Sequence, residues 1–334
     1  MLNPQYTFDS FILGDGNNFA GGAAQAVADG PAKAFNPFFI YGSAGLGKTH
    51  LLHAIGERVF KKSKRARVTY LLCERFTEEL IQAVENRQIA KFRKKYLRTD
   101  LLLLDEVEFL VRKSPIQKEI SHLFFLMHEA KKQIVLAGRL DAEDLQDLEK
   151  CLVSRFEWGL VTDIQPPDAE TRLAILRRKI GLQGIHVPEE IVKFLARRIH
   201  TSVRQLEEAL TRVATHTEKL TTEVVKSLLR DILKQERRRS LSIEGVQYLV
   251  AKHFDIPVAD MTRKRRSGSS VFPCQVAMYL CHQVNRRSLN TIRAAFGGVA
   301  QDEVLQACGQ VNDRKNTDAD VRQVVHYLTK ELKR

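Results

Sequence analysis

Short apolar runs alternate with helical patterns over the first half of the chain. Four of these runs are apolar over most of their length, as expected for parallel strands buried on both faces. They are Phe38–Tyr41, Val68–Leu72, Leu101–Asp105 and 134–137. Apolar positions recur at helical spacing between the runs, for example over 49–59 and 76–96. This alternation predicts an α/β domain of three layers with a parallel sheet in the middle.

The pattern changes near Pro166 and Pro167, beyond which almost every apolar position recurs at helical spacing. The expected helices cover 168–180, 188–199, 202–216, 221–239, 273–284, 288–296 and 301–311. We therefore divide the chain into an α/β domain at 1–163, a helical segment at 164–235 and an all-helical domain at 236–334.

The chain is basic, and the excess charge is concentrated near its C-terminal end. It has 53 Lys and Arg against 40 Asp and Glu in 334 residues, a formal net charge of +13. Residues 237–334 hold 17 of the basic and 9 of the acidic residues, a net charge of +8. Such a surplus favours a polyanionic partner, because it neutralises phosphates and releases their counterions. A solvated basic surface is the alternative explanation.

The cysteines and the apolar runs indicate a cytoplasmic protein. The five cysteines show no CxxC spacing and no accompanying His cluster, which predicts reduced thiols. No apolar run approaches the ~18 residues of a membrane span, and no signal peptide precedes the first motif.

A glycine-rich segment between an expected strand and an expected helix fits G-x-x-x-x-G-K-[ST] at every fixed position. Gly42, Gly45 and Gly47 let backbone N–H groups turn toward phosphates, and the following helix adds its N-terminal dipole. Lys48 supplies a positive charge for the β- and γ-phosphates, and Thr49 can ligate Mg²⁺. We expect ATP or ADP to bind here together with Mg²⁺.

An acidic pair at the end of the third strand completes such a site. The strand delivers Asp105 to the Mg²⁺, and Glu106 can polarise the attacking water. Acidic pairs are common at strand ends, but the position of this pair downstream of a complete glycine-rich motif favours the nucleotide site.

Specific strings over nearly the whole chain resemble the DnaA family of bacterial chromosomal replication initiators. They are Tyr6-Thr-Phe-Asp-Ser-Phe11, Asn36-Pro-Phe-Phe-Ile-Tyr-Gly42, Gly45-Leu-Gly-Lys-Thr-His-Leu-Leu-His53, Ser154-Arg-Phe-Glu-Trp-Gly159, Lys264-Arg-Arg266 and Ala295-Phe-Gly-Gly298. The resemblance implies an AAA+ P-loop domain with a helical lid, followed by a helix-turn-helix domain. The family's N-terminal partner-binding domain is not represented, so we expect a fragment or a short family member.

The resemblance implies a protein that binds double-stranded origin DNA, oligomerises in its ATP form and uses weak ATPase activity as a switch. Arg155 stands at the position of the arginine finger, which reaches the γ-phosphate bound in the next subunit. Arg204 matches the lid arginine called sensor 2. Each adds a guanidinium to the triphosphate charge and can distinguish ATP from ADP. A surface salt bridge for Arg155 and a plain helix-face arginine for Arg204 are the alternatives.

Three positions of the ATPase domain depart from the family pattern. The sensor 1 strand end has Arg139 where the family has an acidic or small polar group, so the expected water-positioning group is missing. Cys151 replaces a second arginine before the finger. In the segment implied to bind single-stranded DNA, Lys113 is retained, but Pro115 replaces the next basic residue.

The last three expected helices have helix-turn-helix order, with a turn at Gly297-Gly298 and a candidate recognition helix at 301–311. In the family, the basic loop before these helices enters the minor groove. The residues implied to contact DNA are Arg263, Lys264 and Arg265 for phosphates, Arg266 for bases, and Gln275 and Gln301.

The start of the candidate recognition helix is acidic in this chain. The family has Asp-His-Thr-Thr there, whereas this sequence has Ala300-Gln-Asp-Glu303. Carboxylates suit a helix N-terminus but face DNA phosphates unfavourably. Cys274 also replaces an arginine that contacts phosphate in the family. We therefore expect DNA binding with little preference for the family's usual box, as in a divergent paralogue.

Other partners and functions stay open from the sequence. In the family, the helix at 221–239 is linked to acidic phospholipids, and a connector packed on the lid is the alternative. A helicase loader or regulator that acts through replication proteins is the second functional hypothesis, and a metabolic P-loop kinase is the third. The helix-turn-helix order argues against the second, and Arg155 and Arg204 argue against the third.

Overall fold

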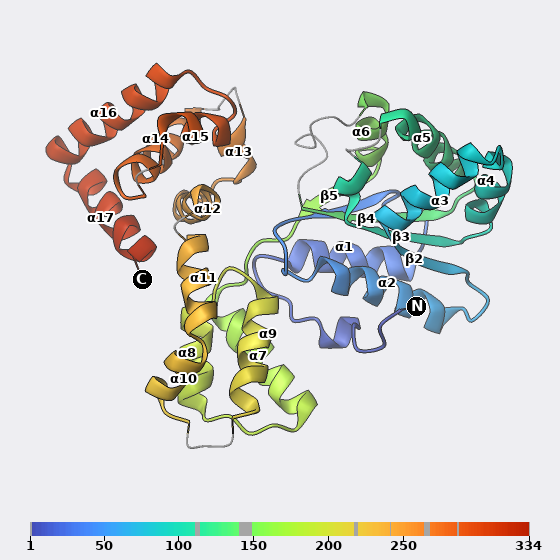
Figure 1. The fold of residues 1–334 in the computed structure, drawn as a ribbon, viewed down its shortest axis with the longest axis horizontal. Helices are drawn as coiled ribbons and strands as arrows, with labels where there is room; N and C mark the ends of the chain where they lie inside the picture. Colours follow the sequence, from blue (N-terminus) through green and yellow to red (C-terminus); the bar gives the residue numbers. More distant parts are fainter. Residues whose placement is uncertain are drawn as a thin grey trace. The chain divides into compact units, whose positions relative to one another are not determined.

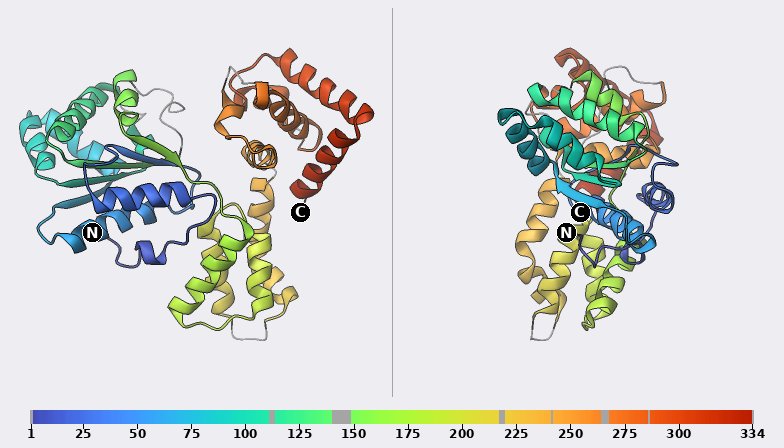
Figure 2. Two further views of the ribbon diagram at one scale, coloured as in Figure 1. Left: turned by 180° about the vertical axis from the view of Figure 1, so that it is seen from behind. Right: turned by 90° about the vertical axis from the view of Figure 1, so that its right-hand side faces the viewer.

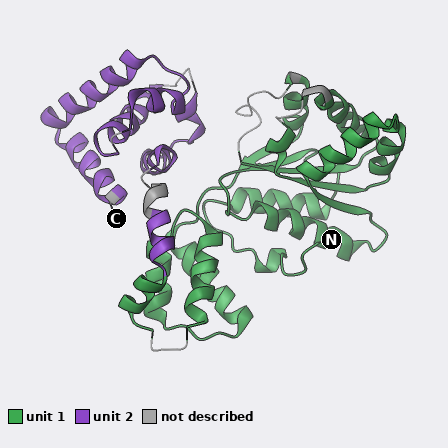
Figure 3. Cartoon of the chain, in the orientation of Figure 1, with its two compact units in different colours: residues 1–228 green, residues 229–334 purple. Residues whose placement is uncertain are grey.

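The computed structural model describes residues 2–110, 114–139, 149–216, 220–240, 242–263, 268–285 and 287–333. The chain divides into two compact units, residues 1–228 and residues 229–334 (Figure 3). Each unit has its own hydrophobic core.

A parallel sheet forms the centre of the first unit (Figure 1). Its strands are β1 (Phe38–Tyr41), β2 (Val68–Leu72), β3 (Leu101–Asp105), β4 (Gln133–Gly138) and β5 (Leu160–Asp163), in the order β2-β3-β4-β1-β5. The four strands expected from apolar runs are confirmed. The fifth, β5, is not among them, because this edge strand ends in the polar residues Thr162 and Asp163 and is only half-buried.

Helices cover both faces of the sheet (Figures 1 and 2). On one face lie α1 (Asn18–Asp29) and α2 (Lys48–Lys62), and on the other lie α3 (Cys73–Glu85), α4 (Ile89–Leu97), α5 (Ser114–Glu129) and α6 (Lys150–Phe156). Successive strand residues supply opposite cores, because side chains alternate across a sheet. Phe38 and Ile40 pack with α1 and α2, whereas Phe39 packs on the other side.

A helical region completes the first unit. It contains α7 (Ala169–Gln183), α8 (Glu189–Arg198), α9 (Val203–Ala214) and α10 (Thr222–Leu228). Asp168 and Ser202 cap α7 and α9 through side-chain oxygens that accept backbone N–H bonds. The single helix expected at 221–239 is instead two helices, α10 and α11 (Arg230–Ser240), separated at Leu229. Neither glycine nor proline occurs there, so the sequence carries no local signal for the break.

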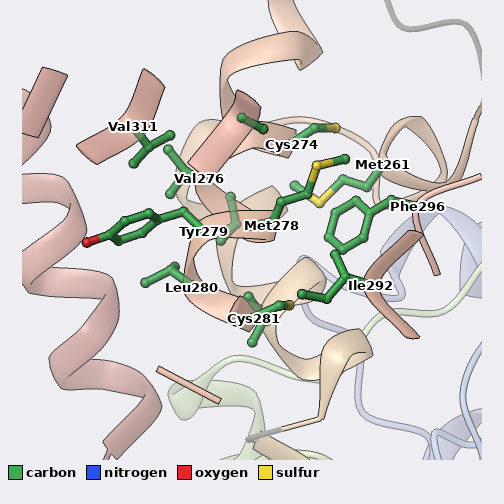
Figure 4. Packing of buried hydrophobic residues seen from close by; sticks show 14 of the residues in the cluster. Met261, Cys274, Val276, Met278, Tyr279, Leu280, Cys281, Ile292, Phe296 and Val311 are labelled. Atoms are coloured by element: carbon green, nitrogen blue, oxygen red, sulfur yellow. The ribbon is translucent and has the colours of Figure 1, made fainter. Parts of the chain in front are cut away.

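The second unit is all-helical. Besides α11 it contains α12 (Ile243–Phe254), α13 (Ala259–Thr262), α14 (Gly268–Gln283), α15 (Leu289–Ala295), α16 (Gln301–Thr317) and α17 (Ala319–Lys333). Residues of α14 such as Val276 and Leu280 lie in the centre of its core, with Phe296 nearby (Figure 4). The helix α14 is apolar nearly all round; it begins at Gly268, earlier than expected, and includes Pro273.

The predicted fold class is confirmed: a three-layer α/β domain with a parallel sheet and an associated helical region precedes an all-helical unit. All five cysteines are free, and only Cys151 is exposed. None of the helices, within the residues that the structure describes, is long and apolar enough to cross a membrane.

Candidate nucleotide-binding and DNA-binding sites

The glycine-rich loop has backbone geometry that requires its glycines. Gly42, Gly45 and Gly47 have φ angles of 146°, 80° and 103°, which L side chains rarely adopt. Close neighbours add a second restriction, because a Cβ atom on Gly42 would lie 2.5 Å from the carbonyl oxygen of Ile164. Gly47 is also the N-cap residue of α2, so the loop leads directly into the N-terminus of that helix. The loop therefore combines turned backbone amides with a helix dipole, as phosphate binding needs.

Lys48 is held inside the loop. Its ammonium group donates to the carbonyl oxygens of Gly42, at 2.5 Å, and Ser43, at 2.8 Å. The residue is only 8% exposed, and burial lowers the pKa of its ammonium group, while the nearby charge of Asp105 opposes that change. Carbonyl oxygens of its own loop thus orient a buried cation at the place where the motif puts the phosphates.

The loop and the acidic strand end are connected by a short hydrogen bond. The Thr49 hydroxyl donates to Oδ2 of Asp105 at 2.6 Å. Tyr70 on β2 also donates its hydroxyl to this oxygen, at 3.3 Å, and the charge of Asp105 adds to burial in raising the pKa of Tyr70. Asp105 is 3% exposed. Tyr70 is not among the sequence candidates, since its contact depends on the pairing of β2 with β3.

A second acidic group follows Asp105. Glu106 has a φ of 59°, an uncommon angle for a side-chain-bearing residue, and its backbone N–H donates to Oδ1 of Asp105 at 3.0 Å. Burial, with the charges of Asp105 and Glu108, raises the pKa of its carboxyl group. A raised pKa in a carboxyl group beside a phosphate loop suits a group that exchanges protons with water.

Arg139, the departure at the end of β4, is paired with Glu108. Its Nε lies 3.1 Å from Oε1 of Glu108, and its backbone N–H donates to Oε2 at 3.3 Å. The positive charge of Arg139 acts to lower the pKa of both Lys48 and Glu106, so Arg139 is close enough to the loop to influence its charged groups. Glu108 is a site residue that the sequence analysis does not single out, although it lies in the acidic string after β3.

Arg204 lies where the helical region meets the loop. Its backbone N–H donates to the carbonyl oxygen of Gly45 at 3.2 Å, and its side chain is exposed. Ser202, the cap of α9, lies so close that a Cβ atom on Gly45 would be 2.3 Å from its Oγ. The start of α9 is therefore in direct contact with the glycine-rich loop of the same chain.

Arg155, at the end of α6, has different neighbours. Its guanidinium carbon lies 3.7 Å from the ring centroid of Trp158 and 5.0 Å from that of Phe125. Among the described residues, these rings are the neighbours of its guanidinium group. Cys151, which replaces the family's second arginine, is exposed one turn earlier on the same helix.

The C-terminal unit has the expected helix-turn-helix order, with α15 and α16 joined by a turn. Gly297 and Gly298 have φ angles of 80° and 71°, and Gly298 N–H donates to the Arg293 carbonyl at 2.9 Å, which closes α15. Gln301 is exposed at the start of α16, followed by the exposed Asp302 and Glu303. The helix extends to Thr317, beyond the expected end at 311.

The other candidate DNA contacts are distributed over two elements. Arg263 ends α13, with its side chain 59% exposed and 3.4 Å from Asp260. Gln275 on α14 donates to Gln310 on α16 at 2.6 Å, so its amide joins the two helices. Gln275 and Gln310 both border a pocket of about 260 Å³ between α14 and α16. Lys113 and Lys264, Arg265 and Arg266 lie outside the described residues.

Two family models match the chain. The model of the bacterial DnaA ATPase domain matches residues 2–163, and that of the bacterial DnaA helix-turn-helix matches residues 243–311. The chain belongs to the bacterial DnaA family of replication initiators. Membership of this family confirms the predicted AAA+ class of the first unit and the predicted helix-turn-helix class of the second.

Solved structures agree with the family models. Domain III of the DnaA protein of Thermotoga maritima is 38% identical, with a TM-score of 0.67, and the match covers 70% of this chain and 99% of that one. The AMPPCP-bound DnaA of Aquifex aeolicus is 30% identical, with a TM-score of 0.62 and coverage of 100% and 98%. A DnaA bound to AMPPCP and single-stranded DNA is also 30% identical, with a TM-score of 0.62 and coverage of 100% and 98%.

Proposed function

We propose that this DnaA-family chain is an initiator whose DNA binding and self-assembly are controlled by ATP. ATP or ADP binds in the loop at 42–49, double-stranded DNA binds to the C-terminal unit, and copies of the chain assemble through Arg155. The observation that carries the proposal is the hydrogen bond from Thr49 to Asp105, which brings both halves of a P-loop site together. The AMPPCP-bound relatives support the nucleotide part.

The residues at the loop fit a magnesium nucleotide. The Thr49 hydroxyl and the Asp105 carboxylate are oxygen ligands, and Mg²⁺ commonly uses one or two such groups together with phosphate oxygens. Phosphate oxygens of the nucleotide would supply further ligands. Bound Mg²⁺ would neutralise charge on the β- and γ-phosphate oxygens.

The arrangement favours a slow ATPase used as a switch. Glu106 is the candidate for orienting and deprotonating the attacking water, since it follows Asp105 and carries a carboxyl group of raised pKa. At the sensor 1 position Arg139 has no acceptor for a water proton, because a guanidinium only donates hydrogen bonds. Its contribution is instead positive charge near the loop, so a group that orients the attacking water is missing at this position and hydrolysis is expected to be slow.

Two arginines distinguish ATP from ADP in this proposal, one within the chain and one between chains. Arg204 acts in cis, since its backbone N–H donates a hydrogen bond to the Gly45 carbonyl of the loop. Arg155 acts in trans, on a nucleotide bound by a second copy. Residues 1–163 then form the AAA+ domain, 164–235 its lid and 236–334 the DNA-binding domain.

Double-stranded DNA binding rests on charge and on the helix-turn-helix. The basic residues at 263–266 supply most of the affinity by neutralising phosphates, and α15 and α16 fix the orientation. Gln301 is the one base-reading candidate in the first turn of α16, where Asp302 and Glu303 repel phosphates. Binding of single-stranded DNA through Lys113 is a further part of the proposal, supported by the relative solved with single-stranded DNA.

Calorimetric titration with ATP tests the nucleotide site. Lys48→Ala should abolish measurable binding, because it removes the buried ammonium group from the loop. Lys61→Ala is the matched control on the same helix, since Lys61 is 65% exposed and paired with Glu57. Wild-type affinity in Lys48→Ala would rule out this loop as the nucleotide site.

A further inference from the structure

Arg155 rests on a group of aromatic rings supplied by two helical segments. Trp158 lies just after α6, and Phe125 and His128 lie on α5. The Trp158 ring meets Phe125 at 6.4 Å and 73°, and His128 at 5.3 Å and 68°, so both contacts are edge-on. We call Phe125, His128 and Trp158 the aromatic shelf. The guanidinium of Arg155 lies over the Trp158 ring, at 3.7 Å from its centroid.

The aromatic shelf is separate from the core beneath it. The inner side of α5 buries Leu123, Phe124 and Met127, which belong to the core of the first unit. Phe125 and Trp158 instead remain 37% and 44% exposed. Packing of the core therefore does not explain why two large aromatic side chains lie at this surface. Their contact with the Arg155 guanidinium does explain it.

The chemistry of the contact leaves Arg155 ready for an anion. A guanidinium that lies over a ring is attracted to the ring's negative face, and its N–H donors point outward in its own plane. A carboxylate partner would neutralise the charge and occupy those donors. None of the ion pairs formed among the described residues involves Arg155. The side chain is thus held in place while its charge and its hydrogen-bonding edge stay available for phosphate.

We propose that the aromatic shelf positions Arg155 for contact with the triphosphate bound by a second copy of this chain. The proposal rests on the proposed trans role of Arg155 and adds the residues that hold it. Phe125 and Trp158 are positioning residues in this scheme, and neither contacts the nucleotide. A supported finger loses less side-chain freedom on contact, so assembly occurs at lower protein concentration.

Trp158 is also the only tryptophan of the chain, which gives the scheme a direct optical signal. Its half-exposed ring is in contact with a guanidinium that gains a phosphate partner on assembly in this scheme. Tryptophan emission should therefore change when ATP drives assembly. It should stay unchanged with ADP, or with ATP at protein concentrations too low for assembly.

The test compares assembly by light scattering with nucleotide affinity by calorimetry in the same variants. Trp158→Leu removes the aromatic face, and we expect normal ATP affinity but a rise of about three- to tenfold in the protein concentration at half-assembly. Phe125→Leu should have a smaller effect in the same direction, since its ring lies 5.0 Å from the guanidinium carbon. Trp158→Phe, which keeps a ring, should restore most of the assembly.

Phe60→Leu is the matched control. Phe60 is 43% exposed and has the Lys64 ammonium group 4.6 Å from its ring centroid, so the variant removes a similar exposed aromatic contact elsewhere. It should assemble as the wild type does. If Trp158→Leu is unstable, Phe125→Leu and the emission change of the wild-type protein still decide the question.

The outcomes separate this proposal from the function on which it rests. Normal assembly of Arg155→Ala would overturn the trans role itself. Loss of assembly in Arg155→Ala, together with wild-type assembly in Trp158→Leu and Phe125→Leu, would overturn the aromatic shelf and leave the trans role standing. A defect in Trp158→Leu that Trp158→Phe does not correct would show that packing, and not the aromatic face, is what matters.

Discussion

Breaking the ion pair between Glu108 and Arg139 should strengthen ATP binding. Two contacts join these residues, one from the guanidinium at 3.1 Å and one from the backbone N–H at 3.3 Å. Burial lowers the pKa of Lys48, and among the nearby charges that of Glu108 raises it and that of Arg139 lowers it. Glu108→Gln removes a negative charge from the surroundings of the loop and frees a guanidinium to pair with the triphosphate.

The exposure of the two side chains limits the size of the effect. Arg139 is 63% and Glu108 is 23% exposed, so solvent reduces the pair to about 1 kcal/mol at most. At about 1.4 kcal/mol per factor of ten, ATP affinity should rise by about two- to fivefold. The gain for ADP should be smaller, because ADP carries less negative charge. High salt should diminish both gains.

Calorimetric titration of ATP and ADP measures this effect. The matched control is Glu57→Gln, since Glu57 is 19% exposed and pairs with Lys61, which is 65% exposed. Glu57 lies on α2 about 13 Å along the helix axis from Lys48, beyond the screening length of about 10 Å at 0.1 M salt. Unchanged or weaker ATP binding in Glu108→Gln, with the control at the wild-type value, would refute the reasoning.

Three other predictions use different measurements. Gly45→Ala should lower nucleotide affinity more than about tenfold, because its Cβ would lie 2.3 Å from Ser202 Oγ at a φ of 80°. The control is Gly181→Ala in α7, where open space surrounds the glycine; this variant should bind nucleotide normally and have a slightly higher melting temperature. Burial lowers the pKa of His50, so the unfolded chain gains a proton below pH 6.5 that the folded chain does not. Urea unfolding should therefore show stability falling from pH 7.5 to pH 5.5, and less so in His50→Gln. Replacing residues 265–266 by alanine should reduce the salt slope of DNA binding by about two units in fluorescence anisotropy, whereas an unchanged slope would remove them from the interface.

The features that the sequence predicts well are those specified by neighbouring residues. The glycine-rich loop is identified in full because its fixed positions all lie within residues 42–49, and the loop geometry follows from the φ angles of Gly42, Gly45 and Gly47. The central strands are equally clear, because β3 and β4 are buried on both faces and therefore read as continuous apolar runs.

What the sequence does not predict depends on contacts between distant segments. The Tyr70 hydroxyl reaches Asp105 only because β2 and β3 pair in register. Likewise the contact of Ser202 with Gly45 follows from how α9 packs against the loop. The partner of Arg139 is nearer in sequence, but no periodicity distinguishes Glu108 from the other carboxylates after β3.

The acidic first turn of α16 has an explanation that does not involve DNA. Ala300, the N-cap residue, provides no side-chain hydrogen bond to the first turn. Asp302 and Glu303 stand where negative charge stabilises a helix, by about 0.3–1 kcal/mol for each residue. Folding of this unit therefore favours carboxylates at a place where phosphate contact would disfavour them. In the proposed scheme the basic residues at 263–266 supply the phosphate contacts, so the stabilised helix is compatible with DNA binding in which α16 reads few bases.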